Sequence, residues 1–227
     1  MSNLIQNKMK LKEKTIKWLR KYQIFVLFLA VVVPFALSVS FYKIMDKTVK
    51  KRRDRIEFLV VHYTANPNPG ATARMNAVYL RNKECAGTHY CIDDTEVVQC
   101  TDEGNVAYAV GDKKWFGFIP KPWLLNKIRN NNSLSFEMCL GGGRSDSLII
   151  ETTAQQLGWQ LVNKGLDISR VVRHYDVSGK HCPRFYYADK QWDQAKEDRA
   201  FYLLKQKVLK YQKIHLDEKN RKKTLVK

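Results

Sequence analysis

The longest run of hydrophobic positions lies near the N-terminus of the chain. Residues 22–42 contain no charged side chain, and a helix of this length, at about 1.5 Å per residue, reaches roughly the 30 Å of a bilayer's hydrocarbon layer. The run therefore predicts one transmembrane helix, with Pro34 tolerated as in other spanning helices. A buried core helix is the second interpretation. A cleaved signal ending near Ser38 and Ser40 is the third, although the run exceeds a normal signal core, so we expect an uncleaved anchor.

The rest of the chain alternates between strand-like and helix-like hydrophobic patterns. Short runs rich in β-branched residues predict strands at 56–61, 134–140 and 168–173, and a hairpin of 89–92 with 97–100. Helical spacing predicts helices at 72–82, 153–163 and 189–215. Residues 111–131 predict a surface loop. Interleaved strands and helices over about 140 residues indicate an α/β domain with a mixed central sheet flanked by helices, preceded by the transmembrane helix.

The apolar face of each predicted helix follows from the same spacing. Met75, Val78 and Tyr79 share one side of the first helix. A capping box of Thr153 and Gln156 opens the second. The apolar positions of the second and third helices are Leu157, Leu161 and Val162, and then Phe201, Leu204, Val208 and Tyr211.

Charge is concentrated at the two ends of the chain. The formal charge is +18, from 40 basic and 22 acidic side chains, yet residues 1–55 carry +11, residues 196–227 carry +7 and residues 56–195 are neutral. Duplex binding favours a basic face on the folded domain, so this distribution argues against a nucleic-acid-binding protein. Two basic arms beside a neutral body instead fit anionic membrane headgroups.

These observations divide the chain into five parts. They are a basic N-terminus at 1–21, the span at 22–42, a basic linker at 43–55, the α/β domain at 56–195 and a basic amphipathic C-terminal helix and tail at 196–227. Seven basic residues precede the span and seven follow it, so the charge count does not orient it. A short basic N-terminus usually stays in the cytoplasm, which would place residue 43 onward outside. The C-terminal helix is interpreted as packed on the domain or, alternatively, as attached to an anionic surface.

Three candidate metal ligands follow predicted strands. His62 and His174 each stand directly after one, and Cys182 lies eight residues beyond His174. Two imidazoles and a thiolate are good Zn²⁺ ligands, and three protein ligands leave a fourth position open, as in catalytic zinc sites. Taken singly, such residues are more often hydrogen-bonded histidines and apolar filler, so the spacing alone leaves both interpretations open.

Four motifs make the chain resemble a known family. In order and approximate spacing, it is similar to the zinc-dependent N-acetylmuramoyl-L-alanine amidases, which include phage lysozyme-type amidases and peptidoglycan recognition proteins. The motifs are residues 60–64 (VVHYT), 87–93 (GTHYCID), 132–137 (NSLSFE) and 174–183 (HYDVSGKHCP). The resemblance covers about residues 56–195. It implies one Zn²⁺ per domain, held by His62, His174 and Cys182.

The resemblance also implies roles for nearby side chains. Lys180 matches the position whose cation stabilises the oxyanion, and Glu137 matches a general base; a buried, unpaired strand glutamate would otherwise be costly. The chain departs from the family at Thr88, where several members carry tyrosine, and Tyr90 has the strand parity to face the same side. Arg184 replaces a common glycine. Thr88, Tyr90 and Arg184 are therefore candidate substrate-binding residues.

Four other cysteines remain, at positions 85, 91, 100 and 139. An extracytoplasmic domain would permit disulfides, with Cys91 and Cys100 the plausible pair across the hairpin, while unpaired core thiols are an equal alternative. Taken together, we expect a membrane-anchored zinc amidase that hydrolyses the amide between N-acetylmuramic acid and L-alanine in peptidoglycan, facing the wall. The alternative is a non-catalytic peptidoglycan-binding module of the same fold.

Overall fold

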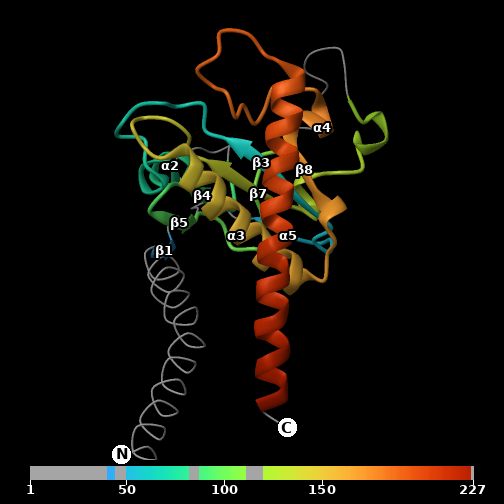
Figure 1. The fold of residues 1–227 in the computed structure, drawn as a ribbon. Coiled ribbons are helices and arrows are strands. Elements are labelled where there is room, and N and C mark those ends of the chain that lie inside the picture. Colours follow the sequence, from blue (N-terminus) through green and yellow to red (C-terminus); the bar gives the residue numbers. More distant parts are fainter. Residues whose placement is uncertain (1–39, 44–49, 82–86, 111–119, 226–227) are drawn as a thin grey trace, which may run out of the picture. The chain divides into compact units, whose positions relative to one another are not determined.

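The computed structural model describes residues 40–43, 50–81, 87–110 and 120–225 (Figure 1). The strands within these ranges are β1 (Ser40–Lys43), β2 (Lys50–Lys51), β3 (Phe58–Tyr63), β4 (Tyr90–Ile92), β5 (Glu96–Gln99), β6 (Asn105–Val106), β7 (Ser133–Met138) and β8 (Val171–Arg173). The α-helices are α2 (Ala73–Arg81), α3 (Asp146–Lys164), α4 (His174–Ser178) and α5 (Gln194–Leu225). Short 3-10 turns are η1 (Pro122–Leu124), η2 (Asn130–Asn132) and η3 (Ile168–Arg170).

A six-stranded mixed sheet forms the centre of the domain, with the order β1-β5-β4-β7-β3-β8. Strands β4, β7, β3 and β8 are parallel, and β4 pairs antiparallel with β5 as the predicted hairpin. All residues of β3 except the last are buried, as expected for a central parallel strand covered on both faces. The sheet confirms the predicted α/β class.

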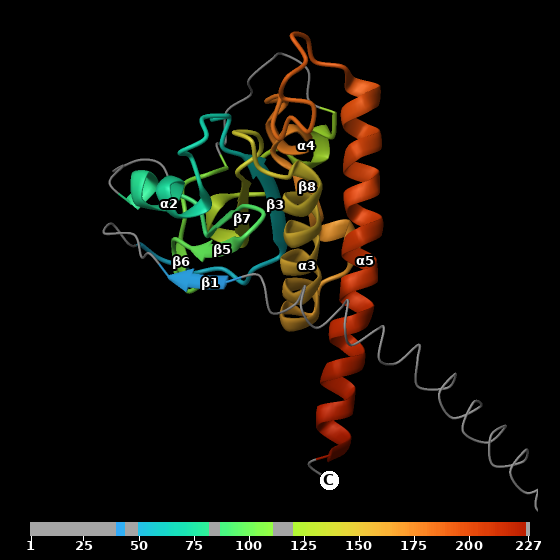
Figure 2. The same ribbon diagram turned by 60° about the vertical axis from the view of Figure 1, so that its left-hand side comes forward.

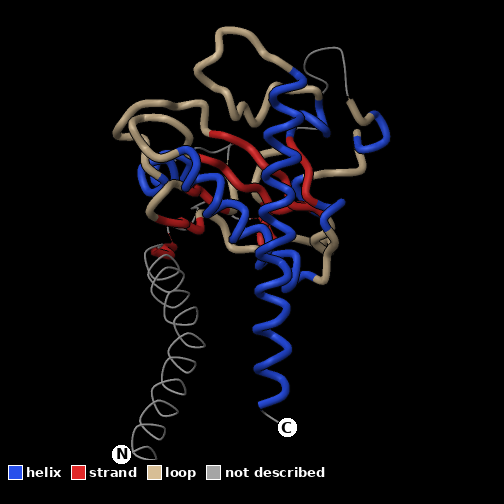
Figure 3. Tube along the Cα trace, viewed as in Figure 1, coloured by secondary structure: helices blue, strands red, loops and turns tan. Residues whose placement is uncertain are grey.

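Helices cover both faces of this sheet (Figures 2 and 3). Alternate residues of β3 point to opposite faces, so Val60 packs with Val172, Ile128 and Val177 on one face. On the other face, Tyr90 and Phe136 stack at 5.1 Å between ring centroids, below α3 and its Gln160. The sheet therefore lies between α2, α4 and η1 on one side and α3 with α5 on the other.

Helices α3 and α5 approach each other closely at Gly158. A Cβ atom at this position would lie 2.8 Å from both the Gln212 nitrogen and the Tyr211 Cβ, which is closer than real contacts allow. The absence of a side chain thus lets α5 rest directly on α3. The predicted inner positions Leu204 and Val208 are fully buried there.

The N-terminal predictions fall largely on residues that are not described. Residues 22–39 of the predicted span lie outside the described ranges, and its last three residues belong to β1 instead of a helix. Aromatic residues such as Phe41 favour strands, which accounts for this boundary. Among the described helices, none combines the length and apolar character needed to cross a bilayer.

The end of the predicted basic linker is part of the folded domain. Lys50–Lys51 pair with β6, and the half-buried Arg52 donates hydrogen bonds to the carbonyl oxygens of Glu103 (2.8 Å), Asn105 (3.0 Å) and Ser133 (3.0 Å). A guanidinium group offers five donors in a fixed fork, so one arginine can join several carbonyls. The linker therefore ends before residue 50.

Two helix predictions are corrected. In α2 the residues facing the sheet are Ala73, Asn76 and Ala77, whereas Met75, Val78 and Tyr79 are exposed. Small residues face inward because α2 lies directly against β4 and β5. Helix α3 begins at Asp146, after an N-cap at Ser145, and not at the predicted capping box. Thr153 is buried within the helix.

The described cysteines are free thiols. Cys91, Cys100 and Cys139 pack in one buried cluster against α2, with 3.6 Å between the Sγ atoms of Cys91 and Cys100. The structure therefore agrees with unpaired core thiols and not with a disulfide between Cys91 and Cys100. Cys85 lies outside the described residues.

Candidate metal centre

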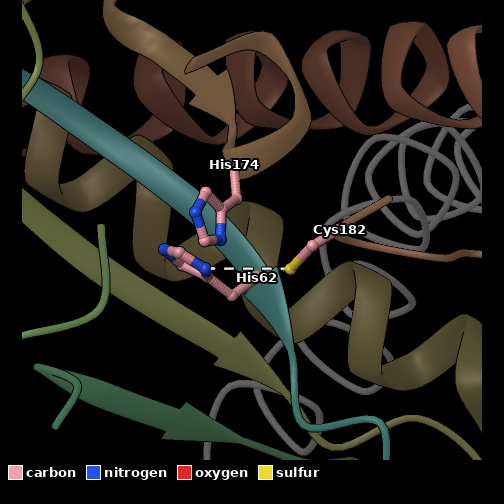
Figure 4. A group of neighbouring side chains, drawn as sticks. All are labelled: His62, His174 and Cys182. Atoms are coloured by element: carbon pink, nitrogen blue, oxygen red, sulfur yellow. Dashed lines mark hydrogen bonds between the residues drawn. The ribbon is translucent and has the colours of Figure 1, made fainter. Parts of the chain in front are cut away.

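The structure brings His62, His174 and Cys182 together at the carboxyl end of the parallel strands (Figure 4). His62 is the second-last residue of β3, so it lies inside the strand and not directly after it as predicted, and His174 is the first residue of α4, directly after β8. Cys182 lies in the loop that follows α4. Its carbonyl oxygen accepts a hydrogen bond of 2.7 Å from the main-chain N–H group of Tyr175. Carboxyl ends of parallel strands meet at one edge of a sheet, which explains why residues 120 positions apart converge.

The geometry of the three side chains fits a metal ion. Their ligand atoms all lie within 4.8 Å of one another, and all three residues are buried. The Cys182 Sγ atom is 3.8 Å from the His62 Nδ1 atom, and the two imidazole rings are 4.7 Å apart at their centroids. The His62 Nε2 atom and both His174 ring nitrogens have no hydrogen-bond partner among the described residues. Buried polar atoms without partners are costly, and a Zn²⁺ ion would bind one nitrogen of each ring.

Electrostatics favour the protonation states that zinc requires of the histidines. Burial lowers the pKa of His174 to about 4, with the nearby Lys180 cation acting in the same sense. Burial also lowers the pKa of His62 well below its usual value, and the nearby His174 and Lys180 lower it further. Both imidazoles are thus neutral at pH 7, the form that binds a metal. In the metal-free protein, burial and the neighbouring Glu137 raise the pKa of the Cys182 thiol, so metal loading would release its proton.

Glu137 lies beside the three ligands. In the parallel pairing of β3 with β7 it is the register partner of His62, and paired positions on adjacent strands point to the same face. Its Oε2 atom has no partner among the described residues, and burial raises its pKa to about 7, against the opposing effect of Lys180. A carboxylate of this kind can both accept and release a proton near neutral pH.

The positive charge of Lys180 acts on the same group of residues. It is half-buried in the loop before Cys182, and its cation shifts the pKa of His62, His174, Glu137 and Cys182. The structure therefore brings all five residues of the expected metal and catalytic set into one region.

Two of the candidate substrate-binding residues lie elsewhere. Tyr90 is on the opposite face of the sheet, where its hydroxyl donates to Glu103 and accepts from Gln160, so it does not approach the ligands. The parity argument failed because Tyr90 pairs with Phe136, whose side chain points away from Glu137. Thr88 is fully buried, and its hydroxyl donates 3.0 Å to the Ser135 carbonyl. The Tyr90 hydroxyl therefore links β4 to α3, and the Thr88 hydroxyl links the segment before β4 to β7.

Arg184 and two tyrosines lie close to the metal ligands. Arg184 is half-buried and donates to the Asp189 carbonyl. Tyr63 follows His62, and its main-chain N–H group hydrogen-bonds Cys182. Tyr63 and Tyr187 line a cavity of about 80 Å³ together with Ala65, Asn66, Pro67 and Leu140. The tyrosines were not expected as site residues, although the position of Tyr63 beside a strand-end ligand is a signal available in the sequence.

Gly141 leaves room for the Tyr187 ring at the wall of this cavity. Its φ angle is +85°, which favours glycine, and a Cβ atom here would lie 2.8 Å from the Tyr187 ring. The Tyr187 ring therefore rests directly on the backbone that follows β7.

Comparisons with known proteins agree with this geometry. The family model described as N-acetylmuramoyl-L-alanine amidase matches residues 52–185. The chain is 31% identical over 143 residues to the N-acetylmuramoyl-L-alanine amidase CwlL of Bacillus licheniformis, covering 59% of this chain and 38% of that protein. It is 34% identical over 142 residues to the amidase BlyA of Bacillus subtilis, covering 58% and 37%. The chain thus spans about two fifths of the length of these relatives.

Solved structures share the fold. The catalytic domain of XlyA superposes with a TM-score of 0.58 at 20% identity, over 75% of this chain and 99% of that one. The Staphylococcus aureus hydrolase AmiA, solved with its ligand, superposes with a TM-score of 0.53 at 18% identity, over 76% and 84%. Since the family model covers more than half of the residues and includes all three candidate ligands, the chain belongs to the N-acetylmuramoyl-L-alanine amidase family.

Proposed function

We propose that this protein is a zinc-dependent amidase that hydrolyses the amide bond between the lactyl group of N-acetylmuramic acid and L-alanine in peptidoglycan. The observation that carries the proposal is the convergence of His62, His174 and Cys182, with unpartnered nitrogens, in a chain of this family. One zinc ion per domain would be held by these three residues. When bound, the ion would polarise the scissile carbonyl and increase the acidity of water.

Glu137 and Lys180 supply the rest of the chemistry. As water attacks the carbonyl carbon, the Glu137 carboxylate accepts one of its protons. Negative charge then develops on the carbonyl oxygen, and the Lys180 ammonium group stabilises it. Glu137 next donates its proton to the L-alanine nitrogen, the carbon–nitrogen bond breaks, and the peptide leaves as an amine while the lactyl group leaves as a carboxylate. A raised pKa at Glu137 suits both transfers.

The direct test is the release of new L-alanine amino termini from purified peptidoglycan by the whole 227-residue chain. A chelator-treated sample should lose activity, and added Zn²⁺ should restore it. No release by folded, zinc-loaded protein would contradict the amidase proposal and favour a peptidoglycan-binding module.

We further propose that residues 22–39, the part of the uncharged run that precedes β1, anchor the protein in the cell membrane by a single span, with the domain on the side of the wall. Support comes from the uncharged run and from the basic residues on both sides of it, which suit anionic headgroups. Because β1 already belongs to the central sheet, the folded domain would begin directly after this span.

Location can be measured with protease added to intact, wall-stripped cells. The domain should be cleaved from outside while a cytoplasmic control protein survives. Protection of the domain until the membrane is broken would place it in the cytoplasm. Recovery of a soluble protein that begins after residue 38 would instead indicate a cleaved signal.

A further inference from the structure

The segment that follows the metal ligands contacts both ligand-bearing parts of the chain. It comprises residues 184–198, which form the loop after Cys182 and the first turn of α5, and it lies almost entirely beyond the matched family region. In Figures 1 and 2 the start of α5 lies beside α4 and the loop that follows it. We call the residues Trp192, Glu197 and Asp198 the clamp.

Glu197 joins α5 to the chain just after Cys182. Its side chain is 2% exposed, and its two carboxylate oxygens accept hydrogen bonds from the main-chain N–H groups of Phe185 (2.8 Å) and Tyr186 (3.1 Å). A buried carboxylate requires such donors, because burial otherwise disfavours its charge. Three and four residues after Cys182, the backbone is therefore fixed to the helix.

Asp198 joins α5 to the chain just before His174. Its Oδ1 atom lies 2.7 Å from the Nη2 atom of Arg173, a side chain that is 6% exposed. The same guanidinium group contacts the fully buried Asp176 at 3.0 Å, so Arg173 links α5 to α4. Neighbouring residues of one helical turn thus contact the chain beside two different ligands, Glu197 through the main chain after Cys182 and Asp198 through the side chain before His174.

Trp192 covers the loop between Lys180 and Cys182. Its ring stacks on the His181 imidazole, with centroids 4.3 Å apart and planes 8° from parallel. The Tyr175 ring of α4 lies 5.0 Å away from the indole. Its indole N–H group donates 3.0 Å to Gln194, at the start of α5. The ring therefore connects the ligand loop, α4 and α5.

We propose that the clamp positions His174 and Cys182 for metal binding, so that the start of α5 determines how tightly zinc is held. The inference rests on the proposed zinc site. Because the clamp residues are not themselves among the three ligands, they are positioning residues. Outer-shell groups that orient ligands typically change metal affinity by about 10- to 100-fold when they are removed.

Glu197→Gln in the whole chain tests the clamp, with Glu151→Gln as its matched control. Glu151 also joins α5 to the rest of the domain, through Lys207 and a 2.6 Å hydrogen bond from the Tyr211 hydroxyl, but on α3. We expect both variants to lower the melting temperature of the zinc-free protein. Only Glu197→Gln should weaken zinc binding, by about 10-fold or more in chelator competition. It should also speed hydrogen exchange at Phe185 and Tyr186.

Two outcomes separate failure of the clamp from failure of the proposed function. Equal zinc affinity in wild type, Glu197→Gln and Glu151→Gln would overturn the clamp alone. A folded wild-type protein that binds no zinc would overturn the metal site and the clamp with it. If Glu197→Gln does not fold, Trp192→Ala replaces it, and we expect weaker zinc binding that Trp192→Phe restores. Unchanged affinity in Trp192→Ala would then count against the clamp.

Discussion

Histidine side chains at the two ends of the central sheet differ in whether their ring nitrogens have hydrogen-bond partners. At the carboxyl end of the parallel strands, His62, His174 and Glu137 have polar atoms without partners among the described residues. At the other end, both ring nitrogens of His89 are engaged. Its Nδ1 atom accepts from the Ser135 main chain at 3.0 Å, and its Nε2 atom lies 2.8 Å from Arg52. The two histidines of the site thus keep ring nitrogens that can bind a metal, whereas His89 uses both of its nitrogens to hold the fold together.

Glu137 and Glu103 differ in the direction in which their surroundings shift the pKa. Burial raises the pKa of Glu137 to about 7. Burial acts on Glu103 in the same direction, but hydrogen bonds from Lys164, Tyr90 and Gln160 outweigh it and lower its pKa. Environment, and not residue type, therefore separates a carboxylate suited to proton transfer from one that stays charged as a structural anchor.

The largest expected difference between the two ends concerns metal. Cys182→Ser should weaken zinc binding more than about 100-fold, because it removes one of three ligands and not an orienting group. His89→Gln should keep one zinc per chain while lowering the melting temperature. Elemental analysis of both purified variants measures this. Full zinc in Cys182→Ser would remove that residue from the ligand set.

A second difference, in turnover, is expected where the metal ligands themselves are intact. Glu137→Gln should retain zinc and lose activity by about 10²- to 10⁴-fold, the usual contribution of a general acid or base. Glu103→Gln, at the other end, should keep its kcat and lose stability. Steady-state rates on peptidoglycan fragments, with zinc content checked beside them, provide the measurement. Normal activity in Glu137→Gln would assign proton transfer to another group.

The smallest effect concerns stability in acid. The pKa of Glu103 is lower in the folded than in the unfolded protein, so its contribution is present above the unfolded pKa, near 4.3, and is lost as the pH falls through the folded pKa. The free energy of unfolding in urea should therefore fall more steeply in wild type than in Glu103→Gln as the pH falls from about 4.3 through the folded pKa. Parallel profiles for the two proteins would show that the Lys164 ion pair contributes nothing.

Local patterns were sufficient to predict the strands that precede the two histidine ligands, but not β1, β2 or β6. The run at 56–61 predicted a strand, and the structure has β3 at Phe58–Tyr63 with His62 near its carboxyl end. Of the strand predicted at 168–173, the structure has only the second half as β8, directly before His174, because residues 168–170 form the turn η3. Parallel strands that end in polar residues need no further information to bring those residues together. The α/β class followed from the same alternation.

Facing directions and long-range contacts were not available from those patterns. Tyr90 was assigned to the wrong face because parity within one strand says nothing about its register with β7. Helix α2 turned its small residues inward because the sheet lies close beneath it, a distance that no local spacing encodes. Glu197 resembled any acidic residue in the first turn of a helix, and its two main-chain partners are 11 and 12 residues away.

The close contact at Gly158 couples the packing of α3 to the position of the whole helix α5. The contact at Tyr211 and Gln212 is about 14 residues from Glu197, which corresponds to roughly 21 Å along a helix axis. A stiff rod cannot bend away locally, so a methyl group added at position 158 would tilt or slide the whole helix and displace its far end. Under the proposed clamp, a substitution at this helix-packing position would therefore weaken zinc binding without touching any residue near the ligands.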